Sequence, residues 1–354
     1  MNTTLQGNFL FLFLNNSMLN ETSDINQGQD VSGMAKKMKI AQVVVLIIAF
    51  LGIFENSISI LALKKSKELR NPTTTFIINL CVADLLYCVS NLITYLNHEW
   101  NKNYYICRWN TMAKYFFAGE SVYLIVGITI NRFICVVHPQ VYRSIYRPIS
   151  LTFQIVFTWF YALFLASLPF FEVWGKYGYD VNVGLCTILK VNGKSASSFL
   201  FITAFVIPTT VFTVCYPLIF RVTHKAYKRA RRSNRLRTTA TLNTTSAEEN
   251  SRGKKTSYRA DAKEMKILKV MLVVVVAYIL CFFPIAFVKI SGKDAQMPTF
   301  VLFAYFAVNV SNVINPIIYI LMSAEYRKAY LELFKCRNNF LVWSTSSNAE
   351  LIRT

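Results

Sequence analysis

The sequence predicts an all-α membrane protein: a seven-transmembrane helix bundle with a short amphipathic eighth helix. Its 354 residues are 54% hydrophobic and only 16% charged, whereas about a quarter of the residues of soluble proteins are charged. Seven apolar stretches reach the roughly 20 residues that a helix needs to cross a bilayer. Lysine and arginine gather between these stretches, as in proteins that cross the membrane several times.

The predicted spans form one domain, residues 40–322. Strands of a membrane barrel would be shorter and would alternate between polar and apolar residues, so the spans are expected to be helices. Residues 1–39 precede this domain as a tail, and residues 323–354 follow it as an amphipathic helix and a second tail. The expected spans are residues 40–63, 73–96, 105–137, 149–171, 199–222, 267–289 and 299–321.

The distribution of positive charge predicts the topology. The net charge is +20, and the largest share of lysine and arginine falls in a loop at about residues 223–266. Cytoplasmic loops carry such an excess, so we expect a multi-pass protein of the plasma membrane with its N-terminus outside. Lys36, Lys37 and Lys39 oppose this orientation but are outnumbered. Basic runs beside membrane spans suit anionic lipids or a cytosolic partner and do not indicate nucleic-acid binding.

Several covalent modifications follow from this topology. Cys107 and Cys186 stand at the outer face, where an oxidising environment would join them in a disulfide. Cys336 follows the amphipathic run 323–335 on the cytoplasmic side, which suits palmitoylation. Glycosylation sequons, which also arise by chance, begin in the outer tail at Asn2, Asn15 and Asn20.

Each apolar stretch also carries a short motif. In chain order these are Asn56, Leu80-Cys81-Val82-Ala83-Asp84, Asn131-Arg132-Phe133, Trp159, Pro208 with Tyr216, Cys281-Phe282-Phe283-Pro284, and Asn315-Pro316-Ile317-Ile318-Tyr319. From about residue 40 to 336, this order resembles the rhodopsin-like (class A) family of G-protein-coupled receptors. Within the family the chain is most similar to the invertebrate orphan group of moody and trapped-in-endoderm receptors. Melatonin and medium-chain fatty-acid receptors are more distantly similar.

The resemblance implies a receptor that binds an extracellular small-molecule or lipid ligand and activates a heterotrimeric G protein, for which we expect Gi/o. Receptor kinases and arrestin are further expected partners, because serine and threonine gather in the tail and in the large basic loop. The resemblance implies no catalytic activity. It also implies no cofactor, apart from an allosteric sodium ion.

That ion is expected at Asp84, a carboxylate in the middle of the membrane, where an uncompensated charge costs about 3 kcal/mol or more. Ser121, Ser311 and Asn315 match the positions that complete a sodium or water pocket in the family. The alternative is a neutral Asp84 held by hydrogen bonds alone.

Arg132 matches the arginine of the family's acidic-Arg-aromatic motif, and here Asn131 replaces the acidic residue. Asparagine can accept a hydrogen bond from the guanidinium but cannot neutralise it, so we expect a weaker restraint on the inactive state. Glu264 matches the second family partner of this arginine and would form a latch between the third and sixth spans. Alternatively, Arg132 and Glu264 form a solvated pair worth less than about 1 kcal/mol.

Further residues match moving parts of the family's activation switch. Tyr216 and Tyr319 match two tyrosines that swing inward on activation. Pro284 and Pro316 each remove a backbone hydrogen bond and leave a hinge. Phe282 stands where the family has tryptophan, which keeps an aromatic switch but loses the indole N–H.

Lys114 is expected in the ligand pocket, two helical turns below Cys107. Aminergic receptors of the family carry aspartate at this position, so a cationic amine ligand does not fit, whereas a carboxylate or phosphate does. Lys289, near the outer end of the sixth span, would assist. The alternatives are that Lys114 extends to the interface or pairs with Glu172.

Tyr115, Tyr305 and Asn309 are expected in the pocket wall from their positions alone. Opsins need a lysine at the position of Asn309, so the sequence argues against a photoreceptor.

A membrane transporter or channel is the alternative class of function, because Asp84, Lys114 and Glu120 are ionisable groups within spans. Transporters often contain internal repeats or paired broken helices, and the sequence has neither. An intramembrane enzyme would need a catalytic cluster, whereas the three histidines all lie at loop or interface positions.

Overall fold

The computed structural model describes residues 24–97, 100, 102–180, 185–193, 195–240, 248–291 and 297–333. Seven helices in this part of the chain are long and apolar enough to cross a membrane, which confirms the predicted fold. The N-terminal sequons at Asn2, Asn15 and Asn20 and the expected palmitoylation site at Cys336 lie outside the described residues.

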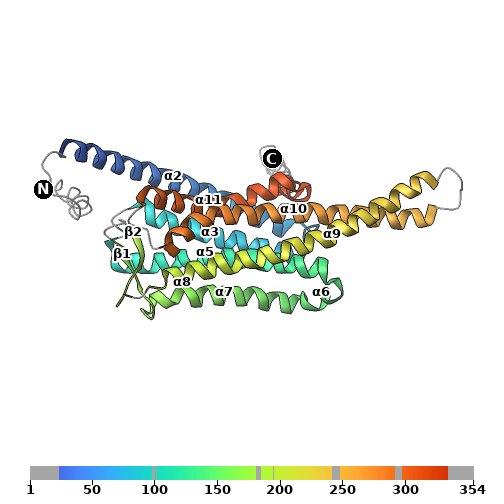
Figure 1. The fold of residues 1–354 in the computed structure, drawn as a ribbon, viewed down its shortest axis with the longest axis horizontal. Helices are drawn as coiled ribbons and strands as arrows, with labels where there is room; N and C mark the ends of the chain where they lie inside the picture. The colour runs from blue at the N-terminus through green and yellow to red at the C-terminus, as the bar shows by residue number, and fades with distance from the viewer. Residues whose placement is uncertain are drawn as a thin grey trace, which may run out of the picture.

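The bundle is elongated, and its two ends differ (Figure 1). A short antiparallel hairpin of β1 (Lys176–Asp180) and β2 (Leu185–Leu189) lies at one end. The helix α6 (Pro139–Ile145) and the far ends of α9 and α10 lie at the other. The helices between them are α2 (Asp24–Lys65), α3 (Pro72–Leu96), α5 (Tyr104–Val137), α7 (Pro148–Phe170), α8 (Ser197–Phe201), η1 (Ile202–Val206), α9 (Ile207–Ala240), α10 (Glu248–Ser291) and α11 (Pro298–Met322).

Local sequence sets where the helices begin. Asn71 accepts a hydrogen bond from the backbone N–H of Thr74 at 3.0 Å, and Pro72 follows in the first turn of α3. Asn103 caps α5 in the same way, through the N–H groups of Tyr105 and Ile106. An asparagine cap satisfies helical N–H groups that otherwise lack a partner, and proline fits the first turn because its missing donor is not needed there.

The helices reach beyond the predicted spans in two places. The predicted tail 1–39 is helical from Asp24, where α2 begins, although the part of this helix that is apolar enough to span a membrane starts only at Lys39. The expected loop 223–266 is also largely helical, since α9 continues to Ala240 and α10 begins at Glu248. Arginine, lysine and alanine favour helix, and no proline occurs in either extension, so nothing ends these helices at the membrane surface.

The core lies along the bundle axis, and the outer surface is apolar as well. Phe76, Leu80 and Leu124 are at most 1% exposed. On the outside, Phe54 is 65% exposed and Leu280 is 68% exposed. A soluble protein rarely exposes so large an apolar surface, so this belt is the face that the hydrocarbon of the bilayer covers.

Small residues let the helices approach closely. A Cβ atom added at Gly127 of α5 would lie 2.8 Å from Cε1 of Phe76 in α3. One added at Gly52 of α2 would lie 2.5 Å from Sγ of Cys88, also in α3. The helix α3 is therefore in close contact on two sides, which fixes the position of Asp84.

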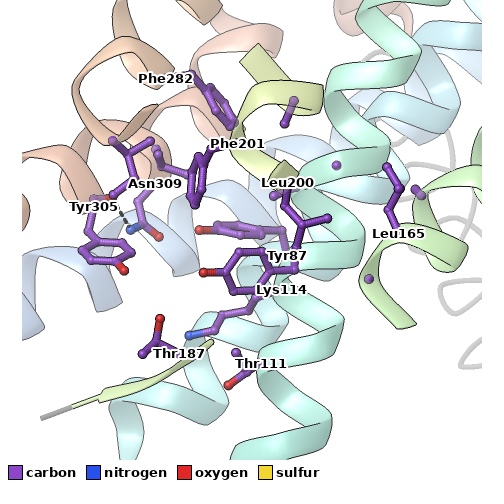
Figure 2. A pocket seen from close by; sticks show the side chains of 18 of the residues that line it. Tyr87, Thr111, Lys114, Leu165, Thr187, Leu200, Phe201, Phe282, Tyr305 and Asn309 are labelled. Carbon is purple, nitrogen blue, oxygen red and sulfur yellow. Dashed lines mark hydrogen bonds between the residues drawn. The ribbon is translucent and has the colours of Figure 1, made fainter. Parts of the chain in front are cut away.

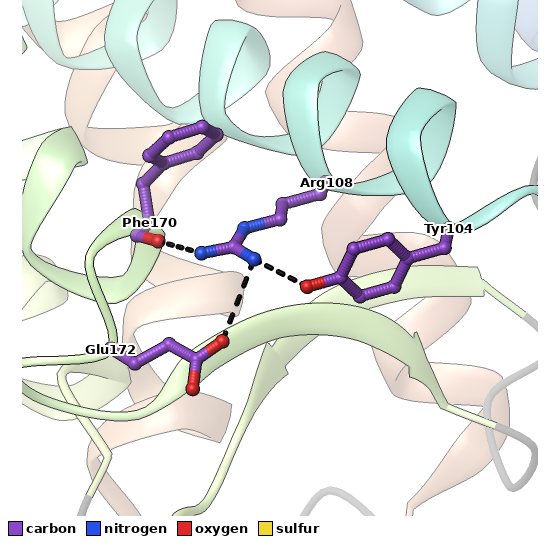
Figure 3. Close-up of polar contacts among 4 residues, drawn as sticks. All are labelled: Tyr104, Arg108, Phe170 and Glu172. Carbon is purple, nitrogen blue, oxygen red and sulfur yellow. Dashed lines mark hydrogen bonds and ion pairs between the residues drawn. The ribbon is translucent and has the colours of Figure 1, made fainter.

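Two sets of contacts at the start of α5 fasten the hairpin and the segment before it to the bundle. Cys107 at the start of α5 forms a disulfide with Cys186 of β2, as predicted. Beside it, Arg108 donates hydrogen bonds to the Phe170 carbonyl and the Tyr104 hydroxyl, and lies 3.5 Å from the Glu172 carboxylate (Figure 3). The disulfide thereby holds the hairpin at the start of α5, and Arg108 connects the start of α5 to the end of α7.

Candidate functional site

A cavity opens inside the bundle next to the hairpin. Side chains from α3, α5, α7, α8, η1, α10 and α11 line it, together with Cys186 and Thr187 of β2. Four residues predicted for the ligand pocket are in this lining: Lys114, Tyr115, Tyr305 and Asn309. The fifth, Lys289, is not, and its Nζ lies 6.0 Å from the centre of the Tyr305 ring.

Lys114 is the only charged residue among the described residues that line this cavity. Its side chain is half-buried and points toward Thr187 (Figure 2). In the described part of the chain no carboxylate lies within ion-pairing distance of its amine. Glu172, the alternative partner, pairs with Arg108 instead. The cavity therefore has a net positive charge.

The polar groups on the α3 and α11 side of the cavity bond to one another. Asn91 donates to the side-chain oxygen of Asn309 at 2.7 Å, and Asn309 donates to the Tyr305 carbonyl at 2.8 Å. Because these amides satisfy each other, they do not need a ligand to compensate for their burial. Lys114 is then the cavity group with most to gain from a ligand.

Phe282 separates this cavity from a smaller one deeper in the bundle. It lines both, and all four residues of the predicted sodium or water pocket line the second cavity. Ser121 donates to Oδ1 of Asp84 at 2.6 Å, and Asn315 donates to Oδ2 at 3.0 Å. Ser311 donates to the Val308 carbonyl at 2.7 Å. Both oxygens of the Asp84 carboxylate thus have a hydrogen-bond partner.

Two tyrosines meet the π-helical turn η1, which borders the ligand cavity. Tyr278 of α10 donates a hydrogen bond to the Ala204 carbonyl in this turn. Tyr123 of α5 lies next to the side chain of Thr203, the preceding residue. A π-helical turn leaves carbonyl groups outside the regular helical pattern, and Tyr278 uses one of them to connect α10 to the fifth span.

Phenylalanine in place of Tyr278 is expected to raise G-protein activation without ligand about 5- to 10-fold. The change keeps the ring but leaves the half-buried Ala204 carbonyl without its donor, which costs about 1 kcal/mol in this conformation. Nucleotide exchange by a purified G protein would measure the effect. Tyr177→Phe removes a similar bond, to the Ala166 carbonyl at 2.9 Å, and serves as the control. Equal basal rates in both variants and the wild type would contradict the prediction.

At the end of the bundle opposite the hairpin, Arg132 and Asn131 share a partner that the sequence did not indicate. Arg132 donates to the hydroxyl of Thr73 in α3, and Thr73 donates to Oδ1 of Asn131 at 2.7 Å. Asn131 also donates to the Tyr142 hydroxyl of α6 at 3.4 Å. Glu264 belongs to α10, but its side chain is not among those described. Asn131 thus connects α3, α5 and α6 without carrying a charge.

The other predicted switch residues lie in the core or within helices. Tyr216 and Tyr319 are buried, at 8% and 1% exposure. Pro284 and Pro316 are inside α10 and α11. Tyr319 stacks on Tyr326 of the helix 324–333, the predicted amphipathic helix, with 5.4 Å between ring centres.

The helix 324–333 is attached to the first span and its loop. Tyr330 shares a hydrogen bond with Ser59 of α2, and Lys328 lies 2.7 Å from the Glu68 carboxylate. This carboxylate raises the pKa of Lys328 above its ordinary value. Because the ion pair is exposed to solvent, it orients the helix more than it stabilises the fold.

A family model described as 7 transmembrane receptor (rhodopsin family) matches residues 55–319. The chain belongs to this family. G-protein coupled receptor moody of Drosophila melanogaster is 30% identical to this chain, over 87% of this chain and 53% of its own length. Protein trapped in endoderm-1 of the same species is 29% identical, over 80% of this chain and 74% of its own. These relatives confirm the predicted subgroup.

The receptor spans about half the length of the moody proteins that it matches. The thyrotropin-releasing hormone receptor of Gallus gallus is 26% identical, over 85% of this chain and 80% of its own. Squid rhodopsin has the same fold, with a TM-score of 0.68 at 21% identity over 83% of this chain and 84% of that chain.

Membership of the family establishes a multi-pass membrane receptor. Receptors of this family have an extracellular ligand and a G protein as partners and are not in general enzymes. The transporter alternative is not favoured. Glu120, one of the residues that suggested it, accepts a hydrogen bond from Thr158 of α7 at 2.9 Å and does not line either cavity.

Proposed function

We propose that the receptor binds an extracellular ligand with a negatively charged group, which lies against Lys114. Binding stabilises an outward position of α10, and a heterotrimeric G protein then binds around Arg132 at the cytoplasmic end. We further propose that the receptor resides in the plasma membrane with its N-terminus outside, and that Gi/o is the class of G protein activated.

The observation that carries this proposal is the unbalanced charge of Lys114. The ligand cavity contains one cation and, in the described lining, no carboxylate. An amine ligand would meet repulsion there, whereas a carboxylate or phosphate would gain a charge-assisted hydrogen bond in a site largely shielded from water. Lys289, whose Nζ lies 6.0 Å from the centre of the Tyr305 ring, adds to the positive potential.

Several features of the bundle would carry the signal from the ligand cavity to the opposite end. Phe282 contacts both cavities, so a ligand that moves it alters the surroundings of Asp84. The turn η1 couples the cavity wall to Tyr278 of α10. Asp84 with Ser121, Ser311 and Asn315 offers the hard oxygen donors that suit Na⁺, and a bound ion would favour the inactive arrangement of these helices. The hinges at Pro284 and Pro316 let the inner halves of α10 and α11 move.

The outer and inner tails complete the proposal. Glycans at Asn2, Asn15 and Asn20 would lie outside the cell. A palmitoyl group at Cys336 would hold the end of the helix 324–333 at the membrane. After activation, receptor kinases and arrestin would act on the serine and threonine residues of the cytoplasmic segments.

The first test is nucleotide exchange by purified Gi, Gs and Gq heterotrimers with the receptor in nanodiscs, without ligand. We expect exchange by Gi above that of empty nanodiscs. Asn131→Asp should lower it about 5-fold, because a carboxylate accepts a stronger hydrogen bond from Thr73 and attracts Arg132, a gain of about 1 kcal/mol.

Asn131→Ala is the matched control, since it removes the contacts with Thr73 and Tyr142 and should raise the basal rate. If neither change alters the basal rate, Asn131 does not restrain Arg132. No exchange by any of the three heterotrimers, with or without ligand, would contradict the proposed function.

A further inference from the structure

We propose that the ligand is an anionic amphiphile whose apolar arm enters a crevice between α5 and α7. The crevice is the part of the ligand cavity lined by Ala118, Gly119, Ala162, Leu165, Ala166 and Leu200. This inference rests on the proposed function in one respect only, since it places the charged headgroup at Lys114.

Residues with small side chains keep the crevice open. Ala162 and Ala166 lie one turn apart on α7 and are each 2% exposed. Opposite them, α5 contributes Gly119, where an added Cβ would meet only Cε2 of Tyr123, at 3.8 Å. The contrast with Gly127, whose Cβ would meet Phe76 at 2.8 Å, is informative. Gly127 is needed for contact between helices, whereas Gly119 leaves space within the ligand cavity.

Two backbone carbonyls in the crevice wall, those of Ala166 and Leu200, already accept hydrogen bonds. The Tyr177 hydroxyl donates to the Ala166 carbonyl at 2.9 Å, and the Thr203 hydroxyl donates to the Leu200 carbonyl at 2.9 Å. A buried water needs two to four polar partners, and this wall offers alanine, glycine and leucine side chains instead. Hydrocarbon gains about 25 cal/mol for each Å² of apolar surface removed from water, so an alkyl arm suits the crevice.

The charged group lies between two different halves of the cavity. Figure 2 shows Tyr305 and Asn309 on one side of Lys114 and Leu165 on the opposite side. Gly119 is five residues beyond Lys114 on α5, which places the crevice about 7.5 Å deeper along that helix. A molecule with one anionic headgroup and one apolar arm satisfies both features. A peptide or a multiply charged nucleotide would leave polar groups in the apolar half.

The test uses hexanoate, decanoate and neutral methyl decanoate as probes of the receptor in nanodiscs. The readout is the shift in thermal unfolding temperature, which needs no G protein. We expect decanoate to stabilise the wild type at a concentration about 10-fold lower than hexanoate does, and methyl decanoate to have no effect. Gly119→Leu fills the crevice and should remove the advantage of decanoate while the response to hexanoate remains. Gly119→Ala should have an intermediate effect.

Ala166→Leu fills the crevice from α7 and gives a second variant if Gly119→Leu unfolds. Lysophosphatidate tests a phosphate headgroup with the same kind of arm, and stabilisation by it alone would assign the headgroup to phosphate monoesters. Equal decanoate responses in the wild type and both crevice variants would overturn the inference. So would the absence of stabilisation by decanoate and lysophosphatidate alike.

The binding readout separates this inference from the proposed function. If decanoate or lysophosphatidate stabilises the receptor through the crevice but no heterotrimer exchanges nucleotide, the inference stands and the proposed function fails. If the receptor activates Gi but neither amphiphile stabilises it, the inference alone is overturned.

Discussion

Alanine in place of Arg132 is expected to abolish ligand-dependent nucleotide exchange while leaving ligand binding within about 3-fold of the wild type. Arg132 lies in the last two turns of α5 and donates to Thr73, far from the cavity of Lys114. Removing the guanidinium takes away the cation around which the G protein is proposed to bind, together with a charge-assisted hydrogen bond. Nucleotide exchange and the thermal shift caused by the ligand would be measured on the same nanodisc samples.

Thr73→Val is the matched control for that experiment. It removes the partner of Arg132 but keeps the guanidinium, so exchange should persist and the basal rate should rise. Full activity in Arg132→Ala would place the G-protein contact elsewhere on the cytoplasmic face. Loss of ligand binding in the same variant would indicate a general effect on the fold.

Lys114→Ala is expected to weaken the response to an anionic ligand by about 100-fold. An unpaired anionic group in a site shielded from water loses about 3 kcal/mol when its cationic partner is removed, which corresponds to about two decades in affinity. Lys114→Arg should restore part of the response, because it keeps the charge. Concentration–response curves for exchange, with thermal shifts on the same samples, would measure the change.

Lys289→Ala is the control, because Lys289 is a second lysine near the cavity but not part of its described lining. We expect less than about a 3-fold change for it, as for a screened charge outside the site. A large effect of Lys289→Ala together with a small effect of Lys114→Ala would make Lys289 the anchor of the anionic group.

The spans could be predicted from the sequence because a bilayer sets both the length and the polarity of a crossing helix. The predicted third span, 105–137, differs from α5 by one residue at its start. The helical extensions of α9 and α10 were not predicted, since polarity marks where the membrane ends but not where a helix does. The start of α2 at Asp24 was not predicted for the same reason.

Residues of the site could be predicted from the sequence where the type of a single residue indicates its role. Lys114 and Asp84 are ionisable groups at membrane depth, and the sequence alone points to them. Thr73, Tyr142 and Ala204 could not be predicted, because their roles depend on which neighbour reaches a hydroxyl or a backbone carbonyl. Gly119 gave no signal either, since a glycine that leaves space and one that permits contact, such as Gly127, look the same in a sequence.

Because α10 is long, a small tilt at Pro284 causes a large displacement at its far end. From Pro284 back to its start at Glu248, the helix is about 54 Å long at 1.5 Å per residue. A tilt of roughly 5° at the proline therefore moves the far end by about 5 Å. A displacement of a fraction of an ångström beside Phe282 and Tyr278, which are close to Pro284, therefore becomes a displacement of several ångströms at the start of α10. The long helix thus converts the small displacement that a ligand causes into a movement large enough to change the surface that another protein binds.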